Sequence, residues 1–228
     1  LRTKDVLYAD VHRAAAREIA AETFVLLKNT DNLLPLEQKG RIALIGPMAD
    51  ARNNMCGMWS MTCTPSRHAT LLESLRSAVG DKAEILYAKG SNIYYDERLE
   101  KGAVGIRPLE RGDNRQLLDD ALATAARADI IVAALGECAE MSGESPSRTN
   151  LEIPDAQQDL LKALVKTGKP VVLLLFTGRP LILNWESEHI PSILNVWFGG
   201  SETGDAVADV LFGKAVPCGK LTTTFPRS

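Results

Sequence analysis

Five short apolar runs constrain the fold of this chain more than any other feature of its sequence. Each run is apolar at every position instead of alternating with polar residues, which is typical of β-strands buried on both faces. The runs cover residues 42–45, 85–87, 130–135, 171–176 and 193–196. Strands of this kind need a layer of helices on each side of their sheet.

Helix-like segments lie between these runs. They cover residues 70–79, 114–127, 154–166 and 202–212. The third begins with Pro154 at an expected first helical position and stops at Gly168. Strands that alternate with helices predict an α/β fold with a doubly wound, mainly parallel sheet and helices on both faces, that is, an α/β sandwich.

Three further elements are expected outside this core. A long helix begins at Asp10, a good N-cap residue, and is predicted to end near Asn29. Residues 90–113 carry many charges and contain four glycines and one proline, so they are expected to form a long surface loop. The final stretch, 221–225, could add one strand at an edge of the sheet.

Composition excludes some classes of function. The 228 residues carry 26 Lys and Arg against 29 Asp and Glu, a net charge of −3, which argues against a general binder of nucleic acid or anionic membranes. No apolar run approaches the roughly 20 residues that cross a bilayer. Because the sequence starts with Leu1 and stops at Ser228 without a tail, a piece of a longer protein is expected.

The four cysteines, Cys56, Cys63, Cys138 and Cys218, form neither a CxxC pair nor a Cys/His cluster of zinc spacing. The three histidines are too scattered along the chain to change this, so no metal site is expected. The spacing favours free thiols. A Cys56–Cys63 bridge stays open as the alternative and would need an oxidising compartment.

In doubly wound sheets ligands gather at the carboxyl ends of the strands. The segment 136–148, which follows the third apolar run, holds three carboxylates, Glu137, Glu140 and Glu144. A flexible acidic loop can deliver a general acid or base. The structural alternative is that Glu137 and Glu140 are solvated or cap backbone amides, while Glu144 pairs with Arg148.

Other chemistry is less well supported by the sequence. No GxSxG motif is present, which argues against a serine hydrolase. The glycine-rich segment 198–204 lacks a Lys-Ser/Thr pair, so helix docking or a tight turn is the better interpretation. Trp59 lies in a non-periodic stretch rich in Met and Gly, where it could be a platform for a sugar ring, an anchor at a domain interface, or a plug over the local core.

Four separated motifs follow one another along the chain. They are His12-Arg13 to Glu18 with Val25-Leu26-Leu27-Lys28-Asn29 and Leu34-Pro35-Leu36; Ile45-Gly46-Pro47 with Ala49-Asp50; Gly136-Glu137 with Glu144 and Ser147-Arg148; and Gly178-Arg179-Pro180 with Gly219-Lys220-Leu221 and Phe225-Pro226. In this order and spacing they resemble the second, α/β-sandwich domain of glycoside hydrolase family 3, especially its bacterial β-glucosidase branch. The resemblance extends over about residues 10–227.

The resemblance implies a retaining β-glycosidase mechanism shared between two domains. A preceding barrel domain supplies the aspartate nucleophile, and the sandwich domain supplies the acid/base glutamate, for which Glu144 is the matching position. Glu137 resembles a position with a more structural role and remains the rival. Trp59 and Ser142 are assigned to substrate binding, Trp59 at the subsite beyond the cleaved bond.

The resemblance also implies a division of the chain and its partners. Residues 1–35 are expected to be a linker and leading helix from an absent barrel domain, and 36–228 the sandwich domain. The expected substrate is an oligosaccharide or aryl β-glycoside, without cofactor, nucleic acid or membrane, in the periplasm or outside the cell. Without the barrel the chain should be catalytically silent. The alternatives are a β-xylosidase of the same family or a non-catalytic scaffold or interaction domain.

Overall fold

A six-stranded sheet forms the middle layer of the structure, a computed structural model that describes residues 6–105 and 109–228. The strands are β1 (Val25–Asn29), β2 (Arg41–Ile45), β3 (Glu84–Ala88), β4 (Ile130–Gly136), β5 (Val171–Phe176) and β6 (Ser192–Asn195). Their order is β1-β6-β5-β4-β2-β3, and β1 is antiparallel to β6 whereas the other neighbours are parallel. Strands β2 to β6 coincide with the five apolar runs, which confirms the predicted doubly wound, mainly parallel sheet.

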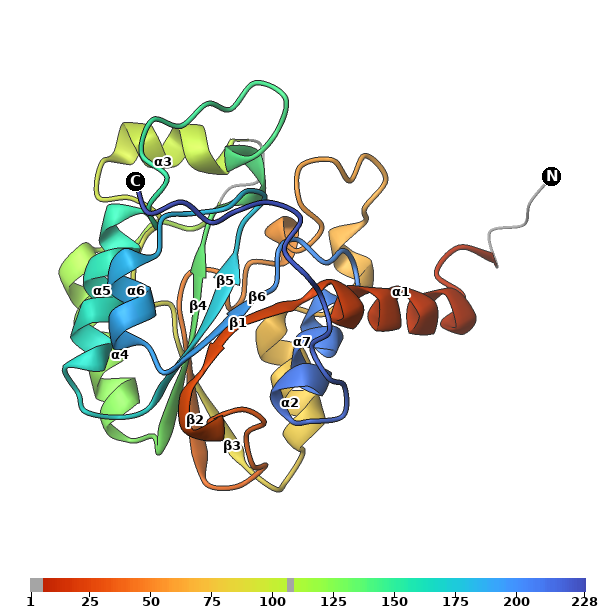
Figure 1. Ribbon diagram of the computed structural model, residues 1–228, viewed down its shortest axis with the longest axis horizontal. Helices are drawn as coiled ribbons and strands as arrows, with labels where there is room; N and C mark the ends of the chain where they lie inside the picture. Colours follow the sequence, from red (N-terminus) through yellow and green to blue (C-terminus); the bar gives the residue numbers. More distant parts are fainter. Residues whose placement is uncertain (1–5, 106–108) are drawn as a thin grey trace.

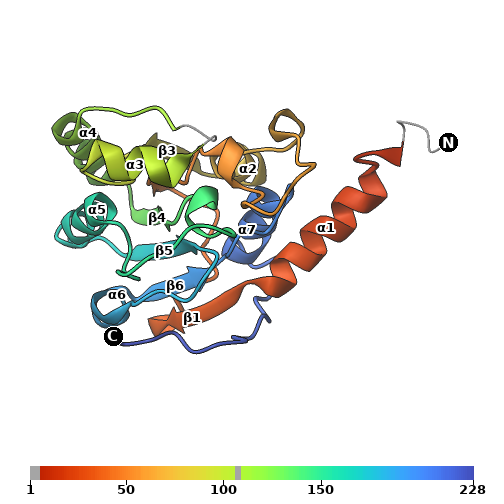
Figure 2. The ribbon, with the colours of Figure 1, turned by 90° about the horizontal axis from the view of Figure 1, so that it is seen from above.

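Helices cover both faces of the sheet (Figures 1 and 2). They are α1 (Asp10–Thr23), α2 (Leu71–Val79), α3 (Glu97–Val104), α4 (Asn114–Ala126), α5 (Asp155–Val165), α6 (Asn184–His189) and α7 (Thr203–Leu211). Helices α2 and α7 pack on one face, and α4, α5 and α6 pack on the other, whereas α1 packs against α7 with its C-terminal end and otherwise projects from the sheet. No helix in the described part of the chain has the length and apolar character needed to cross a membrane.

Two hydrophobic clusters, one on each face of the sheet, account for the unbroken apolar runs. Leu44 and Leu174 point into the cluster shared with α2 and α7, whereas their neighbours Ala43 and Leu173 point into the cluster shared with α4 and α5. All four are fully buried. Burying a side chain such as leucine stabilises the fold by roughly 1.5–3 kcal/mol. A polar residue at either kind of position would therefore be costly.

The N-terminal helix is shorter than predicted, because α1 ends at Thr23 and the chain turns extended at Phe24. Phe24 is fully buried, and the next residues form β1, in which Val25 lies opposite Asn195 of β6. The prediction of helix up to Asn29 was wrong because pairing with β6 outweighs the helical propensity of this stretch. Helix α1 is fastened to the segment before α7 by two hydrogen bonds from Arg13 to Glu202, of 3.1 and 3.0 Å.

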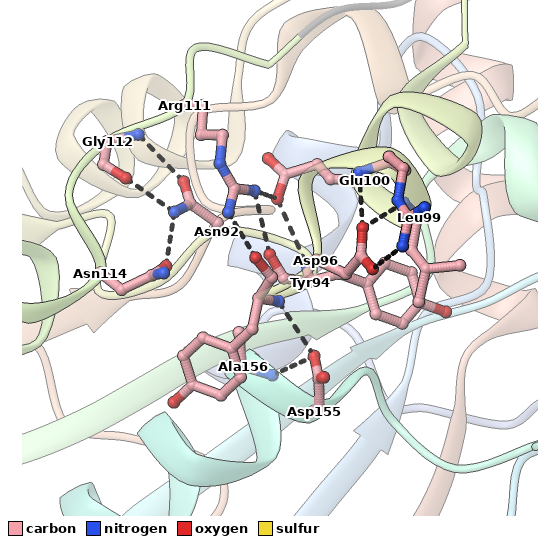
Figure 3. A network of polar contacts seen from close by, with 12 residues as sticks. Asn92, Tyr94, Asp96, Leu99, Glu100, Arg111, Gly112, Asn114, Asp155 and Ala156 are labelled. Atoms are coloured by element: carbon pink, nitrogen blue, oxygen red, sulfur yellow. Dashed lines mark hydrogen bonds and ion pairs between the residues drawn. The ribbon is translucent and has the colours of Figure 1, made fainter.

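The segment 90–113 is also more ordered than a surface loop, since its described residues contain α3. A polar network fixes it (Figure 3). Arg111 donates a 3.0 Å hydrogen bond to the backbone carbonyl of Tyr94 and forms an ion pair with the buried Glu100. The amide nitrogen of Asn92 donates to the backbone carbonyl of Gly112 and to the side chain of Asn114, the first residue of α4, and the amide oxygen of Asn92 accepts from the Gly112 N–H. The expectation of a long loop was therefore wrong, although it includes residues 106–108, which lie outside the described residues.

The expected last strand over 221–225 is absent from the described structure, and this prediction was wrong. The edge of β6 that it could have joined is already occupied by β1. The C-terminal segment instead crosses the start of β1, where the backbone N–H of Gly219 donates to the carbonyl of Phe24 at 3.0 Å. Further on, the ring of Phe225 lies 6.1 Å from that of Trp197. The segment thus covers the sheet edge without pairing along it (Figure 2).

Candidate active-site loops

The loops that follow the parallel strands meet at one edge of the sheet, the upper edge in Figure 1. The strand order reverses between β2 and β4, which is where doubly wound sheets bind ligands. Gly46 turns sharply out of β2 with a φ of +139°, and a Cβ atom there would lie 2.1 Å from the carbonyl oxygen of Ala134. Only glycine fits so close to the neighbouring strand.

A buried ion-pair cluster holds the base of the acidic loop 137–148. Glu137 directly follows β4 and has no exposed surface. Its carboxylate accepts hydrogen bonds from Arg148 at 2.7 Å, from the Thr177 hydroxyl at 2.9 Å and from the Gly178 N–H at 3.3 Å, and lies 3.2 Å from Nε of Arg179. This single carboxylate ties both ends of the loop to each other and to the turn after β5.

The outer part of the acidic loop is exposed. Glu144 lies there, and no hydrogen bond or ion pair joins it to another described residue. The structural alternative in which Glu144 pairs with Arg148 is wrong, because Arg148 instead reaches the base of the loop and pairs with Glu137. The two glutamates therefore differ sharply: Glu137 is buried between two guanidinium groups, and the carboxylate of Glu144 is free to meet another molecule.

Ser142 lies inside the loop cluster. Its hydroxyl is buried and has no hydrogen-bond partner among the described residues. It packs tightly against Gly178, since a Cβ atom added at Gly178 would lie 2.1 Å from the Ser142 Oγ. The third carboxylate of the loop, Glu140, packs beside Gly105 at the end of α3. Helix α3 thus supports the acidic loop from one side.

A second loop, residues 55–63, lies against the acidic loop. The side chain of Met58 packs on Gly143, where a Cβ would be only 2.7 Å from the Met58 Cγ. One turn earlier, the buried Asn54 side chain accepts a 2.9 Å hydrogen bond from the Ala139 N–H. Trp59 follows Met58 and is 67% exposed. The structure therefore brings the two sequence-predicted residues Trp59 and Glu144 onto neighbouring loops, both accessible.

Neither Asn54 nor Met58 was singled out from the sequence. Asparagine in a turn and methionine in a loop carry no local signal, and their roles appear only when loops distant in the chain pack together. Tyr94 is a further unexpected neighbour, since it lines two small cavities together with Ser147 and Arg148 of the acidic loop. Burial is the main cause that raises its pKa, so the phenol is protonated at neutral pH.

The structure resolves the open question about the cysteines. Cys56 and Cys63 form a disulfide, which closes a ring that contains Trp59. The favoured expectation of free thiols was therefore wrong for this pair. His68 lies beside the disulfide, and the ligand atoms of Cys56, Cys63 and His68 lie within 4.8 Å of one another. Cys138 is buried, which raises the pKa of its thiol, and Cys218 is an exposed free thiol.

This arrangement places an accessible carboxyl group and a flat apolar surface on neighbouring loops. The accessible carboxylate of Glu144 stands on a loop whose base is locked by ion pairs, and the exposed indole of Trp59 stands on a loop closed by a disulfide. A carboxyl group can exchange protons with a leaving group, and an indole can stack on a sugar ring.

Comparison with known proteins gives one consistent family. The sequence model of the glycosyl hydrolase family 3 C-terminal domain matches residues 24–228. The chain is 46% identical over 224 residues to a periplasmic beta-glucosidase of Salmonella typhimurium and 37% identical to a beta-xylosidase of Formosa agariphila, in each case covering 96% of this chain and 29% of the relative. It thus spans less than a third of the length of these relatives.

Solved structures agree with this assignment. A beta-glucosidase from Listeria innocua, crystallised in complex with isofagomine, superposes with a TM-score of 0.82 at 33% identity, covering 99% of this chain and 28% of that one. A beta-glucosidase from Bifidobacterium adolescentis superposes with a TM-score of 0.80 at 30% identity, covering 99% and 30%. The family model and the fold agree over nearly the whole sequence, and the chain belongs to glycosyl hydrolase family 3, as its C-terminal domain.

Proposed function

We propose that this chain supplies part of the active site of a retaining β-glycosidase and that Glu144 is the acid/base residue. The preferred activity is that of a β-glucosidase. A preceding barrel domain in the same protein supplies the aspartate nucleophile. Its presence is supported by the length of the relatives, of which this chain spans 29%. On this proposal residues 1–35 lead from the barrel and 36–228 form the sandwich domain.

The single observation that carries the proposal is the contrast between the two glutamates of one loop. An acid/base must reach the glycosidic oxygen, give up its proton and take one back from water. Glu144 is exposed and unpaired among the described residues, so it is available for this role. Glu137 has no exposed surface and is paired with two guanidinium groups, so it is withheld from a substrate.

In the proposed reaction the aspartate attacks the anomeric carbon while Glu144 protonates the departing oxygen. Glu144 then removes a proton from the water that releases the sugar. Retention requires the two carboxyl groups to lie about 5 to 5.5 Å apart, so the loop must be held firmly against the barrel. The ion-pair cluster at its base supplies that support from this side.

Trp59 contacts the part of the substrate beyond the cleaved bond, because it is exposed on the loop that packs against the Glu144 loop through Met58 and Gly143. The buried hydroxyl of Ser142 fits this role only if the loop shifts when substrate binds. A periplasmic or extracellular location is supported by the Cys56–Cys63 disulfide and by the relative named as periplasmic.

The test compares the complete enzyme with its Glu144→Gly variant on aryl β-glucosides with good and poor leaving groups. We expect kcat/KM to fall about 100-fold or more for poor leaving groups and much less for good ones, since general acid catalysis contributes roughly 10²–10⁴-fold. Azide should restore turnover by forming a glycosyl azide. Glu188→Gly, which removes an exposed glutamate from α6, is the matched control and should match the wild type.

A rate that hardly changes in Glu144→Gly would reject the assignment and leave the scaffold function as the better alternative. The isolated chain, which lacks a nucleophile on this proposal, should show no turnover. A β-xylosidase is the second candidate, supported by the Formosa agariphila relative. The ratio of kcat/KM for aryl β-xyloside to that for aryl β-glucoside distinguishes the two enzymes.

A further inference from the structure

Three potential metal ligands come together on the segment between β2 and α2. Nε2 of His68 lies 3.7 Å from Sγ of Cys56 and 3.5 Å from Sγ of Cys63, and the two cysteines are joined as a disulfide. None of the three takes part in the proposed glycosidase chemistry. They are nevertheless packed so that one imidazole nitrogen faces both sulfur atoms.

The orientation of His68 is set by its surroundings. The residue is only 3% exposed, and its Nδ1 lies 3.4 Å from the backbone carbonyl of Ala69. A proton on Nδ1 can be donated to this carbonyl, which leaves Nε2 with its lone pair directed at the sulfurs. Metal-binding histidines are fixed in this way, by a hydrogen bond from the nitrogen that does not bind the metal.

The cluster is accessible from outside. Both cysteines are only partly buried, and they line a surface cavity of about 730 Å³ together with Arg67 and residues of α1. A small reductant or a hydrated ion can therefore reach the sulfurs. The Cα atoms of the cysteines are 6.5 Å apart and lie in a loop outside the sheet. Side-chain rotation and a loop adjustment can separate the sulfurs around an ion without moving a strand of the sheet.

We propose that Cys56, Cys63 and His68 form, once the disulfide is reduced, a binding site for one Zn²⁺ ion with a water molecule as fourth ligand. Two thiolates and one imidazole match the sulfur and nitrogen ligands that zinc prefers. The ring that contains Trp59 then has two closed forms, one closed by the disulfide and one by the metal.

The chemistry balances in two steps. A dithiol reductant gives two electrons and two protons to the disulfide, which becomes two thiols while the reductant becomes a cyclic disulfide. Zn²⁺ then binds the two sulfurs and displaces both thiol protons to solvent, and His68 lends its Nε2 lone pair without losing a proton. The two thiolates cancel the charge of the ion, so the site can lie beside apolar neighbours.

The test is a cobalt and zinc titration of this chain. The protein is reduced with dithiothreitol, freed of reductant without oxygen, and titrated with Co²⁺. We expect one Co²⁺ per chain, with a thiolate-to-cobalt charge-transfer band and the visible bands of tetrahedral cobalt. Zn²⁺ should displace the cobalt and abolish these bands, and the competition gives the zinc affinity. The oxidised chain should show neither band.

Three variants make the result specific. His68→Gln and Cys63→Ser should bind Zn²⁺ about 100-fold more weakly or worse, since each removes a ligand and even losing a supporting contact costs roughly 10–100-fold. Cys218→Ser is the matched control, because it removes an exposed cysteine outside the cluster and should bind as the wild type does. Far-UV circular dichroism checks the fold of each.

The proposal is overturned if the reduced wild type shows no charge-transfer band, if the band survives in Cys63→Ser, or if it is lost in Cys218→Ser. Should reduction alone unfold the chain, Zn²⁺ must restore the native circular dichroism during refolding without oxidant. A reduced chain that zinc does not restore overturns the proposal as well. No enzymatic activity is needed for any of these readouts, so they are independent of the proposed function.

Discussion

Replacing Glu137 by glutamine should destabilise the protein by about 3 kcal/mol. Breaking a buried ion pair by removing one partner costs roughly 3–5 kcal/mol, because the remaining charge is left uncompensated. Glu137 has no exposed surface and faces two guanidinium groups, whose side chains are 11% exposed at Arg148 and 23% exposed at Arg179. The lower end of the range applies, because both arginines keep some contact with water and the glutamine oxygen can still accept from Thr177.

The assay is urea denaturation followed by circular dichroism, with thermal unfolding as a second measure. For a domain of this size, about 3 kcal/mol corresponds to a fall in Tm of roughly 6–12 °C. The m-value should not change, since the same surface is exposed on unfolding. Glu144→Gln is the matched control, as it changes the same residue type in the same loop but breaks no contact, and should lie within about 0.5 kcal/mol of the wild type.

A loss below about 1 kcal/mol for Glu137→Gln, or equal losses for the two variants, would refute the reasoning. A double-mutant cycle with Arg148→Met sharpens the test. If the ion pair is the source of the effect, the double variant should lose clearly less stability than the sum of the two single variants. Additive losses would mean that the two side chains stabilise the loop separately.

Two other substitutions test backbone geometry and buried charge. Gly136→Ala should lower the free energy of unfolding, measured by urea denaturation, by about 3 kcal/mol, because the φ of +132° is strained for alanine and the new Cβ would lie 1.9 Å from the carbonyl oxygen of Phe176. Gly102→Ala in α3 is the control, since this position has open space around it and the change should be neutral or slightly stabilising. Equal losses for the two variants would contradict this reasoning. Glu186 is 4% exposed, and its burial raises its pKa above that of the unfolded chain. Its ionisation in the folded protein therefore lowers stability as the pH rises from about 4 through the raised pKa, so Glu186→Gln should increase Tm more at pH 7 than at pH 4, and an equal gain at both would count against the argument.

The strands of the sheet were predictable because parallel strands covered on both sides must be apolar at every position. The errors lie where pairing between distant segments outweighs local preference. Phe24 and the residues after it suit a helix by composition, yet they complete the free edge of β6. Helix α3 was hidden in a charged stretch, although Asp96 caps it by accepting from the N–H groups of Arg98 and Leu99.

Part of the candidate site was also predictable from the sequence, and the rest depended on contacts between segments that lie apart in the chain. The acidic loop could be found because its position after a buried strand is a sequence feature. The ion-pair partner of Arg148 could not be predicted, since spacing along the chain favoured Glu144 and only the folded loop brings the arginine to Glu137. His68 shows the same limit, because it follows Cys56 by twelve positions and this spacing does not predict their contact.

The C-terminal segment bears on the solubility of the domain. Strand β1 ends the sheet, and a bare strand edge offers unpaired N–H and C=O groups on which another chain can add itself. Residues 219–227 lie over this edge through Gly219 and Phe225, and the backbone carbonyl of Arg227 accepts a 2.7 Å hydrogen bond from Asn184. They contribute little to the core itself. Their role is protective, because they cover the edge strand and so hinder β-sheet pairing with another protein molecule.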